Sequence, residues 1–181
     1  ANSRLVLERL PARLRDEFSA RELLYVRNYG PHLDLPWQQV FGTVDPREVE
    51  RYCDQHGIEW EWKAQGELRT RQRRPAVLQH PRSGDWVWFN QAHLFHVSSL
   101  PESAQRSLLA ALAEEDLPRN VYFGDGGRIP DAALAEVRAA YAALSSSFAW
   151  QAGDVLMLDN LLVAHGRNPF SGDRKLVVAM A

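Results

Sequence analysis

A histidine and an arginine near the C-terminal end of the chain could together bind a metal ion and an organic acid. His165 ends an apolar run, and Arg174 follows nine residues later, after turn-forming residues that include Asn168-Pro169. A neutral imidazole is a good ligand for a divalent metal such as iron(II). A guanidinium can hold a carboxylate through two parallel hydrogen bonds. The pair would suit a 2-oxo-dicarboxylic acid, which chelates a metal at one end and leaves its second carboxylate for an arginine.

Residue type alone does not decide between this chemistry and a simpler role. A histidine next to a glycine at a strand end can be a structural or surface residue. An arginine at the start of a strand can be a solvated charge. The two side chains can act together only if the fold brings them side by side.

Three apolar runs predict the strands that would position this pair. Residues 155–158 are continuously apolar, which is typical of a buried central strand. Residues 161–165 and 175–181 predict two more strands. If these last two strands pair antiparallel, His165 and Arg174 lie at the same mouth of the sheet.

The rest of the chain alternates between helical and strand patterns. Apolar spacing predicts a helix over residues 3–18 that breaks near Pro11, and further helices from Pro101 and Pro130. Another helix begins after the N-cap residue Asp45 and ends at Gly57. Strands are expected at residues 22–29, 58–63, 68–73, 76–79 and 86–90. Strands at both ends with helices between them favour a β-rich α+β fold, a sandwich or barrel with helical insertions.

Composition sets broad limits on the class of protein. The 181 residues are 45% hydrophobic and 24% charged, enough for one domain, residues 1–181, with a buried core. A net charge of −2 gives no reason to expect nucleic acid or a membrane surface as a partner. No apolar run reaches the roughly 18 residues of a membrane span. A single cysteine, Cys53, excludes a disulfide framework and suits a cytoplasmic location. Oligomeric state is left open.

Two further histidines allow a second hypothesis. On a helix His93 and His96 would share a face and could bind zinc, although no pair of cysteine or glutamate partners is nearby. Asn90, Gln91 or His96 could instead line a substrate pocket. They could also be hydrogen-bonded polar residues at the end of a core strand.

The remaining polar and aromatic motifs have simpler interpretations. The arginines of residues 69–74 predict one polar face of a strand, from which one arginine could reach an acidic substrate or carrier arm. Gly124–Gly127 predicts a turn rather than a phosphate loop. Cys53 has no base beside it in the sequence that would make it a nucleophile. Four tryptophans are expected in the core: Trp60, Trp62, Trp86 and Trp88.

The segment GDVLMLDNLLVAHGRNPFSGDRKLVVAM, Gly153 to Met180, resembles the C-terminal signature of the TauD/TfdA family of iron(II)- and 2-oxoglutarate-dependent dioxygenases. Four other stretches resemble the SyrP-like branch of this family, which is linked to peptide natural-product biosynthesis: residues 23–30, 35–43, 68–77 and 87–96. The resemblance implies a double-stranded β-helix, or jelly roll, with helical insertions. It also implies that Fe(2+) and 2-oxoglutarate are cofactors and that the enzyme hydroxylates an amino-acid-like small molecule or a carrier-protein-bound substrate.

By this resemblance, three residues receive roles. His165 matches the distal histidine of an iron site made of two histidines and one carboxylate. Arg174 matches the arginine that binds the far carboxylate of 2-oxoglutarate. Arg167 is expected to support the same site.

The family's first iron motif, His-x-Asp/Glu, has one literal counterpart, His32-Leu33-Asp34. This match lies in a loop flanked by proline and glycine, and in the family the motif precedes the part that corresponds to Ala1. We therefore interpret the match as a coincidence. We expect the chain to be an N-terminally truncated fragment of the dioxygenase domain, with one of three iron ligands and inactive alone. The alternative is a non-catalytic jelly-roll module that binds a small carboxylate or a protein partner through Arg174.

Overall fold

The computed structural model describes residues 1–30, 35–173, 175 and 177–179. Arg174 lies outside the described residues, as do His32 and Asp34 of the literal His-x-Asp match. The roles assigned to these residues from the sequence therefore stay predictions.

Four antiparallel strands form the main sheet, in the order β2-β3-β1-β6. The central strand β1 (Leu23–Tyr29) pairs on one side with β3 (Leu68–Arg74) and on the other with β6 (Arg119–Phe123). The edge strand β2 (Glu59–Trp62) pairs with β3. Side chains alternate along β2, where both glutamates are exposed and both tryptophans are half-buried, as the sequence predicted.

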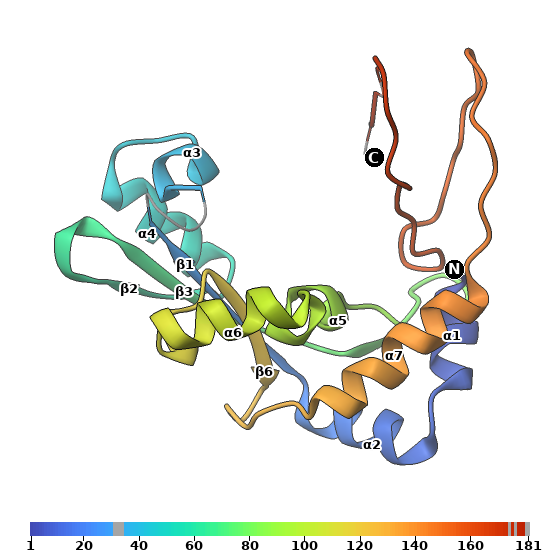
Figure 1. Cartoon of the computed structure of the whole chain (residues 1–181), viewed down its shortest axis with the longest axis horizontal. Helices are drawn as coiled ribbons and strands as arrows, with labels where there is room; N and C mark the ends of the chain where they lie inside the picture. The colour runs from blue at the N-terminus through green and yellow to red at the C-terminus, as the bar shows by residue number, and fades with distance from the viewer. Residues whose placement is uncertain (31–34, 174, 176, 180–181) are drawn as a thin grey trace.

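In the described part of the chain, a separate hairpin and seven α-helices accompany this sheet. The hairpin pairs β4 (Val77–Gln79) with β5 (Trp86–Trp88). The helices are α1 (Ser3–Arg9), α2 (Ala12–Arg21), α3 (Trp37–Phe41), α4 (Pro46–Gln55), α5 (Ala92–Phe95), α6 (Glu102–Ala111) and α7 (Asp131–Leu144). Figure 1 shows α3 and α4 beside one end of the sheet and α1, α2 and α7 beside the other. Within the described ranges, no helix has both the length and the apolarity needed to cross a membrane.

Local sequence signals place the helix ends as predicted. Pro11 separates α1 from α2. The Asp45 side chain accepts a hydrogen bond from the backbone N–H of Arg47, which caps α4. Gly57, just after α4, has φ of +62°, a conformation that glycine adopts without strain.

Two clusters of buried apolar side chains hold the elements together, and β1 contributes to both. Leu23 of β1 packs in the larger cluster, with side chains from α1, α2, β5, β6 and α7. Tyr29, at the other end of β1, packs in the smaller cluster with residues of α3, α4 and β3. The apolar stripe predicted on α7 is confirmed, since Leu134 and Val137 are buried in the larger cluster.

Not all predicted core tryptophans lie in the core. Trp88 is buried against Phe18, with the ring centroids 5.1 Å apart. Trp86 is 57% exposed, although it points to the same side of β5, because it lies at the end of the strand, beyond the cluster. Burial here depends on what lies opposite each side chain and not on residue type.

The prediction of strands in the C-terminal part is wrong for the described residues. After α7 the described residues form no strand, apart from a single bridge between Val163 and Asn2. Val155 and Met157, expected in a buried central strand, are each 93% exposed. A strand needs a neighbouring strand to satisfy its backbone groups, and the described residues provide none along this segment. Figure 1 shows the segment leaving the body as extended arms.

The α+β class with antiparallel sheets is thus confirmed, whereas the described part is less rich in strands than expected. The strand β6 was not predicted, because its sequence RNVYF is short and has no clear alternation. The described strands form two separate sheets, so the jelly roll stays a prediction.

Truncating Phe18 tests the larger cluster. Phe18 is fully buried between Trp88 and Phe123. We expect Phe18→Ala to lower the free energy of unfolding by about 3–5 kcal/mol. Trp86→Ala, the matched control on an exposed aromatic side chain, should cost less than about 1 kcal/mol. Urea denaturation measures both, and equal losses would contradict this description of the core.

Candidate functional site

The position of His165 is set by a short backbone pairing with the start of the chain. Residues 1–3 and 162–164 exchange backbone hydrogen bonds of 2.8–2.9 Å. His165 follows directly, and both His165 and Arg167 are exposed in a segment without regular secondary structure. The contacts that position residues 162–164 therefore also limit where the imidazole of His165 can lie.

The described residues do not form a complete metal site. Among them, no group of three or more His, Cys, Asp or Glu side chains is arranged to hold a metal ion. An iron(II) site of two histidines and one carboxylate needs three such ligands. The exposed imidazole of His165 could serve as one of them. Its predicted convergence with Arg174 involves a residue outside the described ones and stays a prediction.

His80, which the sequence analysis did not single out, connects this segment to the body of the protein. The imidazole is buried, and its Nε2 lies 3.0 Å from Oδ2 of Asp159. This hydrogen bond holds the pKa of Asp159 below its usual range. The sequence did show a turn after His80, but Asp159 is 79 residues away, so no local signal joined the two.

The histidines considered for zinc are used within the fold. The ring of His93 stacks on Tyr141 with centroids 4.3 Å apart. Nδ1 of His96 accepts a hydrogen bond from the backbone N–H of Ser98 at 3.1 Å. Burial lowers the pKa of His93 to about 4 and also lowers the pKa of His96. No zinc site is formed by these histidines in the described part of the chain.

Asn90 and Gln91 occupy the end of the hairpin. The Asn90 amide donates to the carbonyl of Ala76 at 2.8 Å and accepts from the N–H of Ala92 at 3.0 Å. Asn90 is therefore a hydrogen-bonded polar residue at a strand end, the simpler of the two predicted roles. The backbone N–H of Gln91 donates to the hydroxyl of Tyr25.

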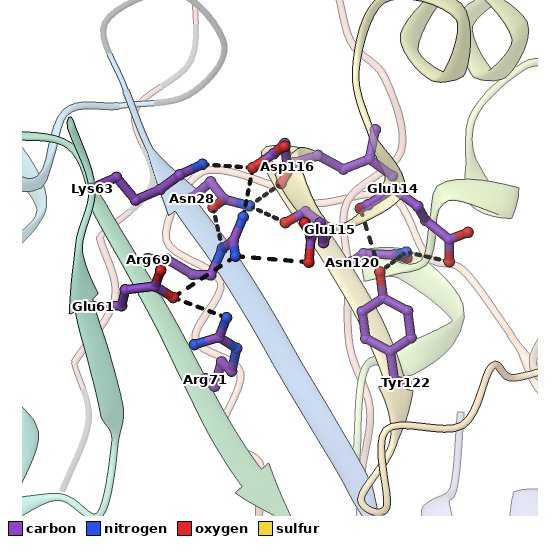
Figure 2. A network of polar contacts seen from close by, with 11 residues as sticks. Asn28, Glu61, Lys63, Arg69, Arg71, Glu114, Glu115, Asp116, Asn120 and Tyr122 are labelled. Carbon is purple, nitrogen blue, oxygen red and sulfur yellow. Dashed lines mark hydrogen bonds and ion pairs between the residues drawn. The ribbon is translucent and has the colours of Figure 1, made fainter. Parts of the chain in front are cut away.

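A network of polar contacts surrounds Arg69 on β3 (Figure 2). Arg69 is 5% exposed, and its guanidinium donates to Oδ1 of Asn28 at 2.8 Å and to Oδ1 of Asp116 at 2.5 Å. Lys63 donates to the same oxygen of Asp116 at 2.6 Å. These bonds tie the loop around Asp116 to the sheet and leave the buried charge compensated.

The arginines of β3 were predicted to form one polar face of the strand, and at Arg69 this polar face is buried. Its charge is matched by acidic side chains of the neighbouring loop, which the strand pattern alone does not show. Arg71 is partly exposed and pairs with Glu61 at 3.0 Å. Arg71 also lines an open hollow of about 440 Å³ that includes Tyr122 and Arg128. Because Arg128 pairs with Glu114, the cations of this hollow already have acidic partners.

Cys53 is buried in the smaller cluster, and burial raises the pKa of its thiol. The thiolate is thus disfavoured, which agrees with a structural role and not with a nucleophile.

Comparison with known proteins identifies the class of protein. The family model "Taurine catabolism dioxygenase TauD, TfdA family" matches residues 1–180. The chain belongs to the TauD/TfdA family.

Two curated relatives are similar over most of the chain. The dapdiamide synthesis protein DdaC of Enterobacter agglomerans is 43% identical over 179 residues, which cover 99% of this chain and 54% of that protein. The clavaminate synthase-like protein At3g21360 of Arabidopsis thaliana is 28% identical over 170 residues, which cover 87% of this chain and 47% of that protein. The chain thus spans about half the length of these relatives.

Asp116 tests the polar network through its pH dependence. The hydrogen bond from Lys63 and the charges of Lys63 and Arg69 lower the pKa of Asp116. This contribution to stability is complete above the unfolded-state pKa of about 4 and is lost as the pH falls through the lower folded-state pKa. At pH 7 we expect Asp116→Asn to cost about 1 kcal/mol, since solvent screens the half-exposed carboxylate. The difference from the unmodified protein should shrink as the pH falls below about 4.

Urea denaturation across this pH range measures the effect. Glu115→Gln is the control, because Glu115 is exposed and lies 4.0 Å from Arg69. A loss of unfolding free energy in Asp116→Asn that does not change with pH would contradict the assignment.

His93 should make the fold sensitive to mild acid. Its folded-state pKa of about 4 lies below the ordinary value of about 6.5, so the unfolded state binds the proton more readily. The contribution of His93 to the free energy of unfolding is therefore fully present above about pH 6.5. This contribution falls as the pH drops towards 4. Compared with His93→Phe, the unmodified protein should lose about 2 kcal/mol more between pH 7.5 and pH 5. Urea denaturation at both pH values measures the effect. Equal losses of unfolding free energy in the two proteins between pH 7.5 and pH 5 would contradict this assignment.

Proposed function

We propose that the protein is an iron(II)- and 2-oxoglutarate-dependent dioxygenase that hydroxylates an amino-acid-like small molecule or a carrier-protein-bound substrate. The observation that supports this most strongly is membership of the TauD/TfdA family over residues 1–180. The second relative, described as clavaminate synthase-like, is consistent with an oxygenase.

The proposal gives the chain roles in binding. His165 supplies one imidazole ligand to the metal, and Arg174 holds the far carboxylate of 2-oxoglutarate with two parallel hydrogen bonds. Arg167, two residues after His165, supports the same site. Because the described residues do not supply the other metal ligands, the proposal assigns no further step to them. A jelly roll is the fold that we propose for the site.

One relative and the sequence resemblance support the proposed substrate class. The name of DdaC assigns that protein to dapdiamide synthesis. Identity of 43% across nearly the whole chain supports a role in natural-product biosynthesis for this protein too. The resemblance to the SyrP-like branch supports an amino-acid-like substrate, either free or tethered to a carrier.

A second candidate function is a non-catalytic module that binds a small carboxylate or a protein partner through Arg174. The two candidates differ in whether carboxylate binding depends on a metal.

Substituting the two key residues separates these functions. Arg174→Ala should weaken 2-oxoglutarate binding about 10–100-fold and leave metal affinity unchanged, since a charge-assisted bidentate contact is lost. His165→Ala should weaken metal binding instead. Calorimetric titrations with cobalt(II) and with 2-oxoglutarate, each with and without the other, measure both effects.

Arg73→Ala is the control, because Arg73 is an exposed arginine on β3. Equal loss of metal and 2-oxoglutarate binding in Arg174→Ala would contradict the assigned role. Carboxylate binding that is independent of metal in every variant would favour the non-catalytic module.

A further inference from the structure

Three segments that are distant in the sequence meet around the buried side chain of His80. His80 precedes the turn between β4 and β5, and Asp85 at the end of that turn pairs with Arg4 of α1 at 3.3 Å. The third segment is the turn at residues 159–162, which leads to the backbone pairing with residues 1–3. His80 is 4% exposed, so its polar ring atoms need partners within the protein.

The contacts of the ring determine which nitrogen carries the hydrogen. Nδ1 accepts a hydrogen bond from the backbone N–H of Ser83 at 3.0 Å. Because a backbone nitrogen can only donate, Nδ1 of His80 has no hydrogen. In the neutral imidazole the hydrogen is then on Nε2, which donates to Oδ2 of Asp159 at 3.0 Å.

The second oxygen of Asp159 organises the turn that follows. Oδ1 accepts from the backbone N–H groups of Leu161 at 3.0 Å and Leu162 at 3.4 Å. The main-chain carbonyl of Asp159 also accepts from Leu162 and Val163. The carboxylate thus joins the β4–β5 turn to the residues immediately before His165.

Other roles for His80 are disfavoured by the same contacts. The hydroxyl of Ser83 lies 3.1 Å from Nδ1, so the three side chains resemble a Ser-His-Asp arrangement. The lone pair of Nδ1 already accepts a backbone N–H, and the ring is buried, so the imidazole is poorly placed to take a proton from a nucleophile. The hydrogen on Nε2 likewise prevents this nitrogen from binding a metal.

We propose that His80 is a positioning residue: its Nε2–H holds Asp159 and so anchors the turn from which His165 projects. The anchoring is a property of the described contacts, whereas its importance for the metal rests on the proposed role of His165. The two parts can be measured separately.

The anchoring is tested by hydrogen–deuterium exchange of the metal-free protein. We expect His80→Leu and Asp159→Asn to speed exchange at the amides of residues 161–164 by about tenfold, because each removes a charge-assisted hydrogen bond. In Asp159→Asn, the one carbonyl oxygen cannot serve both His80 and the backbone N–H groups. His80→Gln, whose amide can donate from about the position of Nε2, should stay within about threefold of the unmodified protein.

Asp154→Asn is the matched control, since Asp154 lies in the same segment and accepts only a local hydrogen bond from Gln151 among the contacts described. Amides of the central strand β1 should exchange at unchanged rates in all variants, which separates loss of the anchor from global unfolding. Unchanged exchange at residues 161–164 in both His80→Leu and Asp159→Asn would overturn the proposal. If His80→Leu fails to fold, Asp159→Asn and His80→Gln still give the answer.

Cobalt(II) affinity tests the consequence for His165. We expect His80→Leu to weaken cobalt binding by about tenfold and His80→Gln to restore it. If His165→Ala abolishes binding while His80→Leu changes exchange but not affinity, the positioning role is wrong and the proposed function stands. If His165→Ala leaves cobalt binding unchanged, the proposed metal role of His165 fails, and exchange alone decides whether His80 anchors the segment.

Discussion

The backbone pairing of residues 1–3 with residues 162–164 determines where the C-terminal segment of the chain lies. After α7 the described residues form no strand, so this pairing and the His80–Asp159 hydrogen bond connect the segment to the folded body. Val155 and Met157 add little apolar burial, because both are almost fully exposed. A few directional hydrogen bonds therefore position this segment, as strand pairing in a sheet would otherwise do.

The polar network around Arg69 illustrates how a charge-rich stretch can be structural. A buried guanidinium without partners would cost several kcal/mol, and the loop that carries Asp116 helps to compensate the charge of Arg69. The same bonds occupy the donors that a ligand carboxylate would need. Arginines that serve the fold in this way are poor candidates for substrate binding, whereas the exposed Arg167 keeps its guanidinium accessible.

The sequence predicted those features that depend on residues close together in the chain. The cap at Asp45, the break at Pro11 and the apolar stripe of α7 each involve neighbours within about one or two helical turns. Features that depend on distant partners were missed or wrong: β6 is defined by its pairing with β1, and Arg69 is buried by the loop at Asp116. From the sequence, Asp159 was only a polar residue between two apolar runs. Its partner His80 is far away in the sequence, so the hydrogen bond could not be predicted.

At the candidate site too, the sequence indicates the residue types but not their positions in space. The pattern around His165 and the residues of the family signature are readable from the sequence, and the family is confirmed over residues 1–180. Their spatial arrangement requires the strands that would bring them together, and apolar character alone does not create a strand without a pairing partner. A single imidazole binds a metal weakly, so its usefulness depends on being held where other ligands can meet it. The hydrogen bond between His80 and Asp159 acts at this point, since it restrains the turn just before His165 whether or not a metal is bound.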